Sequence, residues 1–142
     1  MIEIKVKYVD GVKEIFQAHE GEWYDLRSAM DVHFRESKFF KIPLGIAMEL
    51  PKGYEAHVLP RSSTFEKYGI IMTNGMGVID NKYCGDNDFW SFPAIGTRDV
   101  WIHKNDRIAQ FRIVETQPEV VFKTVVTLGN PDRNGFGSSG RL

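Results

Sequence analysis

Short segments with strand character follow one another along nearly the whole chain, and this feature constrains the fold most. Residues 1–8 alternate apolar with charged side chains, as a half-buried strand does, and Asp10-Gly11 follows as a hairpin turn signal. Gly, Pro, Asn or Asp interrupts most later segments, and no window keeps a helical period for long. We therefore predict an all-β fold, a β-sandwich or jelly roll. The further expected strands are Val12–Phe16, Trp23–Ala29, Phe39–Ile42, Ile46–Leu50, Tyr54–Leu59, Ile70–Thr73, Asp88–Pro93, Val100–His103, Ile108–Val114 and Val120–Leu128.

One short helix is expected within this pattern. Residues 63–66 (STFE) fit a capping box, in which the Ser63 hydroxyl and the Glu66 carboxylate bind free amides of the first turn. Gly69 is the expected C-terminal stop. A helix start that also carries the guanidinium of Arg61 is an anion site, since Arg forms paired, charge-assisted bonds to phosphate. From these residues alone, a plain capped helix and an anion site are equally good interpretations.

The C-terminal stretch from Gly129 to Leu142 is rich in Gly, Asn and Ser and poor in side chains that could be buried. Such a segment cannot offset its own ordering entropy, so it should be mobile when alone. We therefore predict one β domain over residues 1–128 and a mobile C-terminal arm over residues 129–142.

The composition bounds the class of protein. The chain has 142 residues, enough for one domain, and its net charge of −1 comes from 18 basic and 19 acidic residues mixed along it. The absence of a basic stripe argues against duplex nucleic acid as a partner. Cys84 is the only cysteine, so no internal disulfide can form, as expected in a reducing cytosol. We find no signal peptide and no apolar run of membrane-spanning length, and therefore expect a soluble, cytoplasmic protein.

The stretch from Asn74 to Gly85 (NGMGVIDNKYCG) carries the most chemistry. It has the pattern of a hairpin, with an Asn-Gly turn, a short β-branched run and a second turn. Asp80 comes directly after this apolar run, where it would stand at the mouth of a buried strand, and Tyr83 follows it closely. Asp is a common turn residue, so a purely structural role stays open at this point.

The segments on both sides of this stretch make the pattern specific. LPRSS precedes it, and DRIAQ (residues 106–110) and GFGSSG (residues 135–140) follow it. In this order, from about Asp25 to Gly140, the motifs resemble those of the trimeric dUTPase family. The resemblance implies a homotrimeric jelly roll whose three sites combine segments of different subunits. It also implies magnesium-dependent hydrolysis of dUTP to dUMP and pyrophosphate by attack at the α-phosphorus.

The resemblance assigns the central stretch to the base, the sugar and the attacking water. Asp80 would hold and deprotonate the water, which suits a phosphoryl transfer that needs a positioned nucleophile. Asn74 and hairpin backbone groups, including those of Gly77 and Ile79, would bind the Watson–Crick edge of uracil. Tyr83 would pack against the deoxyribose, where a 2′-hydroxyl would collide.

The resemblance assigns the second and fourth motifs to the triphosphate. Arg61, Ser62 and Ser63 would hold the phosphates. Gln110 would lie near them, whereas its neighbours Asp106 and Arg107 would be structural.

The C-terminal arm would close over the bound nucleotide. Phe136 would stack on the base, and glycine amides and serine hydroxyls would surround the γ-phosphate. The residues implied are Arg133, Phe136, Gly137, Ser138 and Ser139. One departure from the family is that only Asn134 separates Arg133 from Gly135-Phe136.

The first motif of the family usually reads Ala-Gly-x-Asp-Leu, and Glu22 and Trp23 replace that Ala and Gly here. Asp25 and Leu26 still align. The resemblance implies that Asp25 binds Mg²⁺ through water, the ion being chelated by the triphosphate itself, which suits a metal that releases its waters reluctantly.

Two other functions stay open. One is a nucleotide-gated regulatory or binding protein that uses dUTP as a signal. The other is a dCTP deaminase-like enzyme of the same fold, against which Asp80 and Tyr83 argue. The sequence leaves open whether a protein partner exists, and whether the chain is cellular or, if viral or from a prophage, acts in the host cytoplasm. The scattered histidines lack metal-ligand spacing, so no zinc site is expected.

Overall fold

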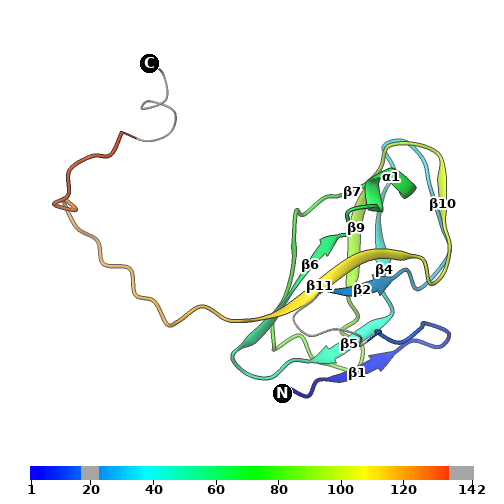
Figure 1. Cartoon of the computed structure of the whole chain (residues 1–142), viewed down its shortest axis with the longest axis horizontal. Helices are drawn as coiled ribbons and strands as arrows, with labels where there is room; N and C mark the ends of the chain where they lie inside the picture. The colour runs from blue at the N-terminus through cyan, green and yellow to red at the C-terminus, as the bar shows by residue number, and fades with distance from the viewer. Residues whose placement is uncertain (17–22, 135–142) are drawn as a thin grey trace.

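The computed structural model describes residues 1–16 and 23–134 (Figure 1). Within these ranges the chain forms eleven strands and one short helix, α1 (Thr64–Tyr68). The predicted all-β class with one short helix is therefore confirmed. The strands are β1 (Lys5–Tyr8), β2 (Tyr24–Arg27), β3 (Val32–Phe34), β4 (Phe39–Pro43), β5 (Ile46–Glu49), β6 (Tyr54–Pro60), β7 (Ile70–Met72), β8 (Gly77–Ile79), β9 (Ser91–Gly96), β10 (Val100–Ile102) and β11 (Arg107–Glu115).

The strands pair in an antiparallel manner and form two main sheets and two ribbons. The larger sheet has the order β2-β11-β6-β8 and the smaller has the order β4-β9-β7, while β1-β5 and β10-β3 are the ribbons. Ala56 and Val58 of β6 are fully buried in the same core cluster as Phe92 and Ala94 of β9. The two main sheets therefore face each other across one core, as in a β-sandwich.

The outer face of the larger sheet carries two of the predicted site residues. Because Ala56 and Val58 point into the core, their neighbour Leu59 faces outward. Leu59 lies opposite Gln110 on β11, and Gln110 lies opposite Asp25 on β2. Register between strands far apart in sequence therefore places Asp25 and Gln110 side by side on that face.

Helix α1 ends as predicted but begins differently. Gly69 has φ +58°, and its N–H donates to the Phe65 carbonyl at 2.7 Å, which confirms the glycine stop. The predicted capping box is wrong, because the Ser63 side chain makes no capping hydrogen bond. Ser63 has φ −95° and ψ −2°, close to helical values, whereas a capping side chain reaches a free amide from an extended residue. The buried Thr64 hydroxyl instead accepts the Arg61 N–H and donates to the Ile108 carbonyl, each at 2.8 Å.

The predicted hairpin over residues 74–85 is also wrong. Among the described strands, β8 pairs with β6 and β7 pairs with β9, so the two segments flanking the Asn74-Gly75 turn enter different sheets. The turn itself forms, with Gly75 at φ +70° and the Met76 N–H donating to the Asn74 carbonyl at 2.7 Å. The three-residue strand β8 instead pairs with the long strand β6, and this pairing adds a fourth strand to the larger sheet.

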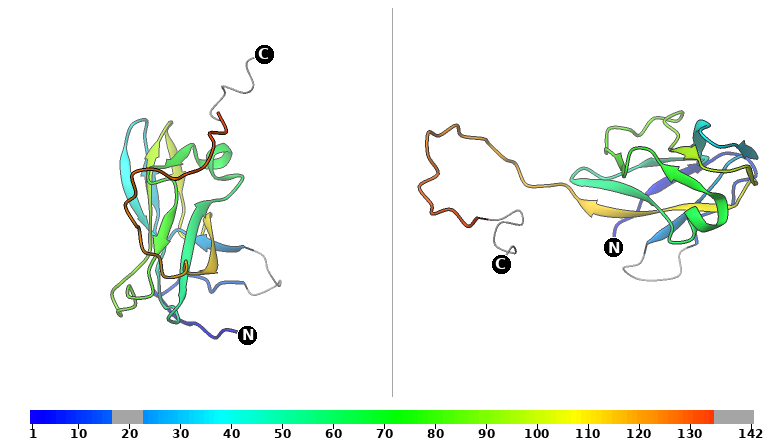
Figure 2. Two further views of the ribbon diagram at one scale, coloured as in Figure 1. Left: turned by 90° about the vertical axis from the view of Figure 1, so that its left-hand side faces the viewer. Right: turned by 90° about the horizontal axis from the view of Figure 1, so that it is seen from above.

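The body of the molecule ends at β11. The Thr116 N–H still donates to the Gly53 carbonyl at 2.9 Å, but residues 117–134 form no helix or strand, and all are exposed. Figures 1 and 2 show this segment running away from the sandwich. The expected strand Val120–Leu128 is therefore not formed, and neither is Val12–Phe16. In the described part of the chain, no helix is long and apolar enough to cross a membrane.

Candidate active site

Three adjacent strands bring Asp25, Arg61 and Gln110 together. Asp25 on β2 lies opposite Gln110 on β11, and Arg61 directly follows Pro60 at the end of β6. The Gln110 side-chain amide donates to the Pro60 carbonyl at 3.0 Å, which ties β11 to the point where β6 leaves the sheet. The first, second and fourth motifs therefore meet within a single chain.

The Asp25 carboxylate is held by two guanidinium groups. Arg61 Nε donates to Asp25 Oδ1 at 2.9 Å, and Arg107 Nη1 donates to Asp25 Oδ2 at 3.2 Å. Arg61 Nη1 also approaches the Arg107 carbonyl oxygen at 3.4 Å. These contacts use Nε and Nη1, on two different edges of the Arg61 guanidinium, so Nη2 is the donor that can serve an anion.

A phenol packs beside this charged cluster. Burial raises the pKa of the Tyr68 hydroxyl, and the charge of Asp106, together with a hydrogen bond to it, raises the pKa further. The positive charges of Arg61 and Arg107 oppose this effect. Tyr68 therefore stays protonated well above neutral pH and links α1 to the start of β11.

Asp80 lies at the opposite end of β6. Ile79 pairs with Ala56, so Asp80 lies near the beginning of β6, whereas Arg61 follows its last residue. The step from Ala56 to Arg61 covers about 17 Å at roughly 3.3 Å per residue. A single chain therefore presents two separate groups of residues: Asp80, and the arginine cluster of Arg61, Arg107 and Asp25.

Asp80 and Tyr83 are both exposed and belong to one tight turn. Asp80 Oδ1 accepts the Lys82 N–H at 2.7 Å, and the Asp80 carbonyl accepts the Tyr83 N–H at 3.1 Å. The Tyr83 hydroxyl donates to the Phe89 carbonyl at 3.0 Å, which fixes the ring. At Gly77, a Cβ would come within 3.1 Å of the Val58 side chain, so glycine lets β8 approach β6 closely.

Comparison with known proteins decides the family. A family model described as dUTPase matches residues 18–140, which is most of the chain. This chain belongs to the dUTPase family.

Relatives of known name agree with this assignment. The chain is 54% identical over 140 residues to the SPbeta prophage-derived deoxyuridine 5'-triphosphate nucleotidohydrolase YosS of Bacillus subtilis strain 168, covering 98% of this chain and 99% of that protein. It is 35% identical over 133 residues to the deoxyuridine 5'-triphosphate nucleotidohydrolase of Gloeobacter violaceus, covering 92% of this chain and 83% of that protein.

Solved structures share the dUTPase fold. A mutant dUTPase of Staphylococcus bacteriophage 80alpha with dUpNHpp superposes with a TM-score of 0.77 at 21% identity, covering 98% of this chain and 99% of that one. A mutant dUTPase of phage phi11 of S. aureus, described as coordinating a structural Mg(II) ion, superposes with a TM-score of 0.75 at 18% identity, covering 89% of this chain and 99% of that one.

The described residues of this dUTPase contain no group of three or more His, Cys, Asp or Glu side chains that could hold a metal ion. Asp25 is therefore not part of such a group within the described ranges. Its two oxygens offer about four acceptor positions. Two arginine contacts occupy part of them, so the site fits a cation that arrives already bound to a ligand and keeps its waters.

Arg133 lies away from both groups, exposed in the segment that leaves the body, whereas Ser62 is exposed directly after Arg61. Other predicted residues, Phe136, Gly137, Ser138 and Ser139, lie outside the described residues, as does Glu22 of the first motif.

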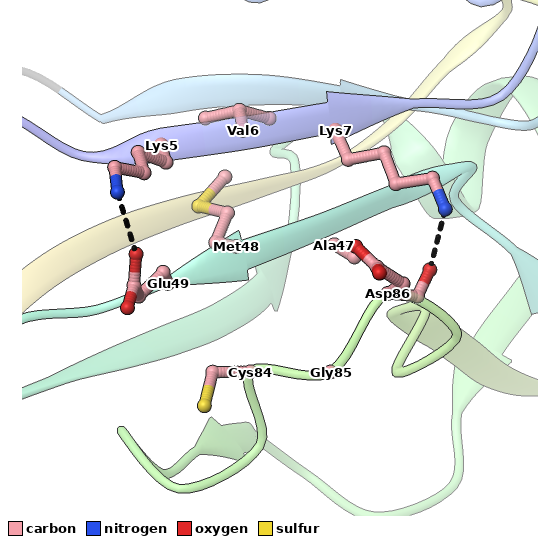
Figure 3. Close-up of a pocket in the computed structure, with 9 residues that line it drawn as sticks. All are labelled: Lys5, Val6, Lys7, Ala47, Met48, Glu49, Cys84, Gly85 and Asp86. Atoms are coloured by element: carbon pink, nitrogen blue, oxygen red, sulfur yellow. Dashed lines mark hydrogen bonds and ion pairs between the residues drawn. The ribbon is translucent and has the colours of Figure 1, made fainter.

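A cavity of about 270 Å³ lies between the β1-β5 ribbon and residues 84–86 (Figure 3). The ammonium group of Lys7 donates to the Asp86 carbonyl at 2.9 Å across it, and Cys84, a free thiol, is exposed at its wall. None of the predicted site residues lines this cavity, so it is separate from both groups.

Sequence reasoning missed Thr64, and it gave Arg107 a structural role without its contact to Asp25. The register of β11 against β2 shifts between Arg107 and Ala109, and Ile108 and Ala109 are both buried in succession. This bulge breaks the two-residue alternation and lets Arg107 reach Asp25, beside which Gln110 also lies. No alternation pattern could reveal this contact. The only signal for Thr64 was a hydroxyl adjacent to a predicted anion site.

Proposed function

We propose that this chain hydrolyses dUTP to dUMP and pyrophosphate. The observation that carries this proposal is the 54% identity, over nearly the full length of both chains, to a protein named deoxyuridine 5'-triphosphate nucleotidohydrolase. The geometry of the two residue groups supports different roles for them: the arginine cluster would bind the triphosphate, and Asp80 would activate the water.

The arginine cluster suits the triphosphate. The Arg61 side chain is only 21% exposed, Asp25 and the Arg107 carbonyl hold it in place, and Nη2 is its proposed donor to the phosphates. Ser62 and Ser63 add hydroxyls directly after it, and neither α1 nor a capping bond uses the Ser63 side chain. A fixed cation costs no reorganisation when charge develops on the phosphate oxygens. Gln110 stands beside this cluster and is assigned to the same phosphates.

Asp80 is the proposed general base. Its exposed carboxylate uses one oxygen for the Lys82 amide, which orients it and leaves acceptor positions for a water. The water oxygen would form a bond to the α-phosphorus while its proton passes to Asp80. The bond from the α-phosphorus to the bridging oxygen would break, and pyrophosphate would leave with that oxygen.

The central turn is assigned to uracil and deoxyribose. The Tyr83 ring is anchored by its hydroxyl on the Phe89 carbonyl, so it presents a rigid wall that a 2′-hydroxyl would meet. Asn74 and the backbone at Gly77 and Ile79 are the proposed partners of the base. A rigid aromatic wall discriminates by steric overlap.

Magnesium would enter this site on the triphosphate. Asp25 would accept hydrogen bonds from the water shell of the ion, and the bound ion would neutralise phosphate charge. The paired arginines keep Asp25 in place for this contact.

A homotrimer with shared sites would unite the two groups. Ile79, the residue before Asp80, lies opposite Ala56, about 17 Å along β6 from Arg61. A complete site therefore needs Asp80 from one subunit and the arginine cluster from another. A second copy could cover the apolar groove of about 570 Å³ that residues 1–4 line with Tyr8, Tyr24, Phe111 and Ile113. Phe122 in the departing segment is 94% exposed and is the kind of side chain that such a groove accepts.

The C-terminal arm is the proposed lid of this shared site. Arg133, Phe136, Gly137, Ser138 and Ser139 would close over the nucleotide held by neighbouring subunits. Closing such a lid would exclude water and bring donors to the γ-phosphate.

The test is pyrophosphate release measured across the deoxynucleoside triphosphates and UTP. We expect rapid release from dUTP only, with Mg²⁺ required. Comparable turnover of UTP would contradict the role of Tyr83. Tight dUTP binding without hydrolysis would favour a nucleotide-gated regulatory protein, and ammonia release from dCTP would indicate a deaminase; either result would overturn the proposal.

A further inference from the structure

We propose that Arg107 is a positioning residue of the phosphate site, which holds Asp25 so that Asp25 in turn holds Arg61. This inference rests on the proposed function, because it assigns Arg61 to the phosphates. It gives Arg107 a part in substrate binding through another residue, without contact to the substrate.

The contacts form a closed arrangement around one carboxylate. Asp25 Oδ1 accepts from Arg61 Nε at 2.9 Å and Oδ2 accepts from Arg107 Nη1 at 3.2 Å, so each oxygen has its own cation. The Arg107 carbonyl, at 3.4 Å from Arg61 Nη1, adds a weaker third contact. The Arg61 guanidinium is thus held at Nε by Asp25 and at Nη1 by the Arg107 carbonyl.

Arg61 is more buried than Arg107, as expected if Arg61 binds the ligand and Arg107 supports it from the solvent side. The Arg61 side chain is 21% exposed and Asp25 is 33% exposed, whereas Arg107 is 49% exposed on the solvent side of the pair. A charge-assisted hydrogen bond is worth most where water is partly excluded. Arg107 therefore acts as the outer support, and Arg61 as the inner group facing the ligand.

The backbone keeps Arg107 in this position. The register shift after Arg107 buries Ile108, whose carbonyl accepts the Thr64 hydroxyl at 2.8 Å. Thr64 also accepts the Arg61 N–H at 2.8 Å, so the main chains at Arg61 and Arg107 are joined through one buried hydroxyl. Replacing the Arg107 side chain should therefore leave β11 in place and remove only the hydrogen bond from Arg107 Nη1 to Asp25 Oδ2.

The experiment is a double-mutant cycle between Arg107→Gln and Asp25→Asn. We measure kcat/KM for dUTP and the dissociation constant of a non-hydrolysable dUTP analogue. We expect Arg107→Gln alone to lower kcat/KM by about 10-fold and to raise the dissociation constant of the analogue by about 10-fold. This is the effect of losing one charge-assisted hydrogen bond. In the Asp25→Asn background, the same substitution should change both quantities by no more than about twofold, because the residue through which Arg107 acts is already altered.

Two further substitutions separate positioning from loss of structure. Arg107→Lys keeps the charge and should recover part of the affinity. Lys67→Gln removes an exposed cation from the nearby helix α1 and should change neither quantity. Melting temperatures are recorded for every variant. If Arg107→Gln has a lower melting temperature than the wild type, Arg107→Lys replaces it in the double-mutant cycle with Asp25→Asn.

Each alternative outcome overturns the inference. A full 10-fold loss that persists in the Asp25→Asn background would mean that Arg107 contacts the phosphates directly. Unchanged affinity in Arg107→Gln would mean that Arg107 has no role. Arg61→Gln distinguishes failure of the proposed function: if this variant binds the analogue like the wild type, Arg61 does not hold the phosphates. If Arg61→Gln loses affinity and Arg107→Gln does not, only the inference fails.

Discussion

The two carboxylates assigned to the site, Asp25 and Asp80, have opposite surroundings. Asp25 is partly buried, and an arginine binds each of its oxygens. Asp80 is exposed, and its Oδ1 accepts a single backbone N–H. A carboxylate between two guanidinium groups is suited to orientation, whereas an exposed carboxylate keeps acceptor positions for a water and its proton. This contrast supports positioning by Asp25 and proton transfer by Asp80.

Asp80→Asn should remove most turnover and leave nucleotide binding intact. The amide oxygen can still accept the Lys82 N–H and keep the turn, but it cannot take a proton from water. We expect pyrophosphate release from dUTP to fall by roughly 10²-fold or more, with analogue affinity within about twofold of wild type. Asp86→Asn, in the same loop, is the matched control and should keep full turnover. Near-normal hydrolysis by Asp80→Asn would show that another group is the base.

At the scale of single elements, α1 depends on a buried threonine for its attachment. The Thr64 hydroxyl connects the end of β6 to the beginning of β11, while Ser63, in the predicted capping position, makes no capping bond. The helix has only five residues, too few to be stable by itself, so its position comes from this tertiary contact. The same contact holds Arg61 at the edge of the sheet.

Thr64→Val should therefore destabilise the protein far more than Ser63→Ala. Valine has nearly the same shape but leaves the Arg61 N–H and the Ile108 carbonyl unpaired, at a cost of about 1–3 kcal/mol in the free energy of unfolding. Ser63→Ala should change that free energy by no more than about 0.5 kcal/mol. Urea unfolding at one fixed protein concentration measures both. Equal costs for the two variants would support a capping role for Ser63.

At the scale of the whole molecule, a single chain separates the two groups of residues assigned to the site. It carries the Asp80 group and the arginine cluster at opposite ends of β6, and it leaves the body after Thr116 with apolar side chains uncovered. Val121 is 88% exposed, Phe122 is 94% exposed and Val126 is fully exposed. Burying such side chains would contribute about 1.5–3 kcal/mol each, which is why we expect them to be covered in the proposed trimer.

Two truncations should separate the lid from assembly. Deletion of residues 130–142 should leave the trimeric mass and the melting temperature without ligand unchanged, and cut dUTP turnover by about 10²-fold, since lid donors are lost. Deletion of residues 117–142 also removes the exposed apolar side chains and should weaken the trimer. Light scattering and pyrophosphate release measure these effects. A full-length chain that is monomeric at micromolar concentration would contradict the trimer. Full activity without residues 130–142 would contradict the lid.

Much of the fold followed from local pattern. Alternation and turn residues predicted the strands that became β1, β5, β6 and β11, and Gly69 predicted the end of α1, because these signals depend only on neighbouring residues. The predicted strand at Val120–Leu128 failed although its composition suits a strand, since a strand also needs a partner, and none of the described strands pairs with it.

By itself, the sequence determined the all-β class and the motifs that mark the family, because each motif needs only the identity and spacing of nearby residues. The tertiary structure alone decided which of these residues meet. It joined Asp25, Arg61 and Gln110 through register across three strands, brought Arg107 to Asp25 through a bulge, and set Asp80 apart by pairing β8 with β6. The physical reason is that pairing between distant strands follows from packing of the common core, which no local stretch of sequence specifies.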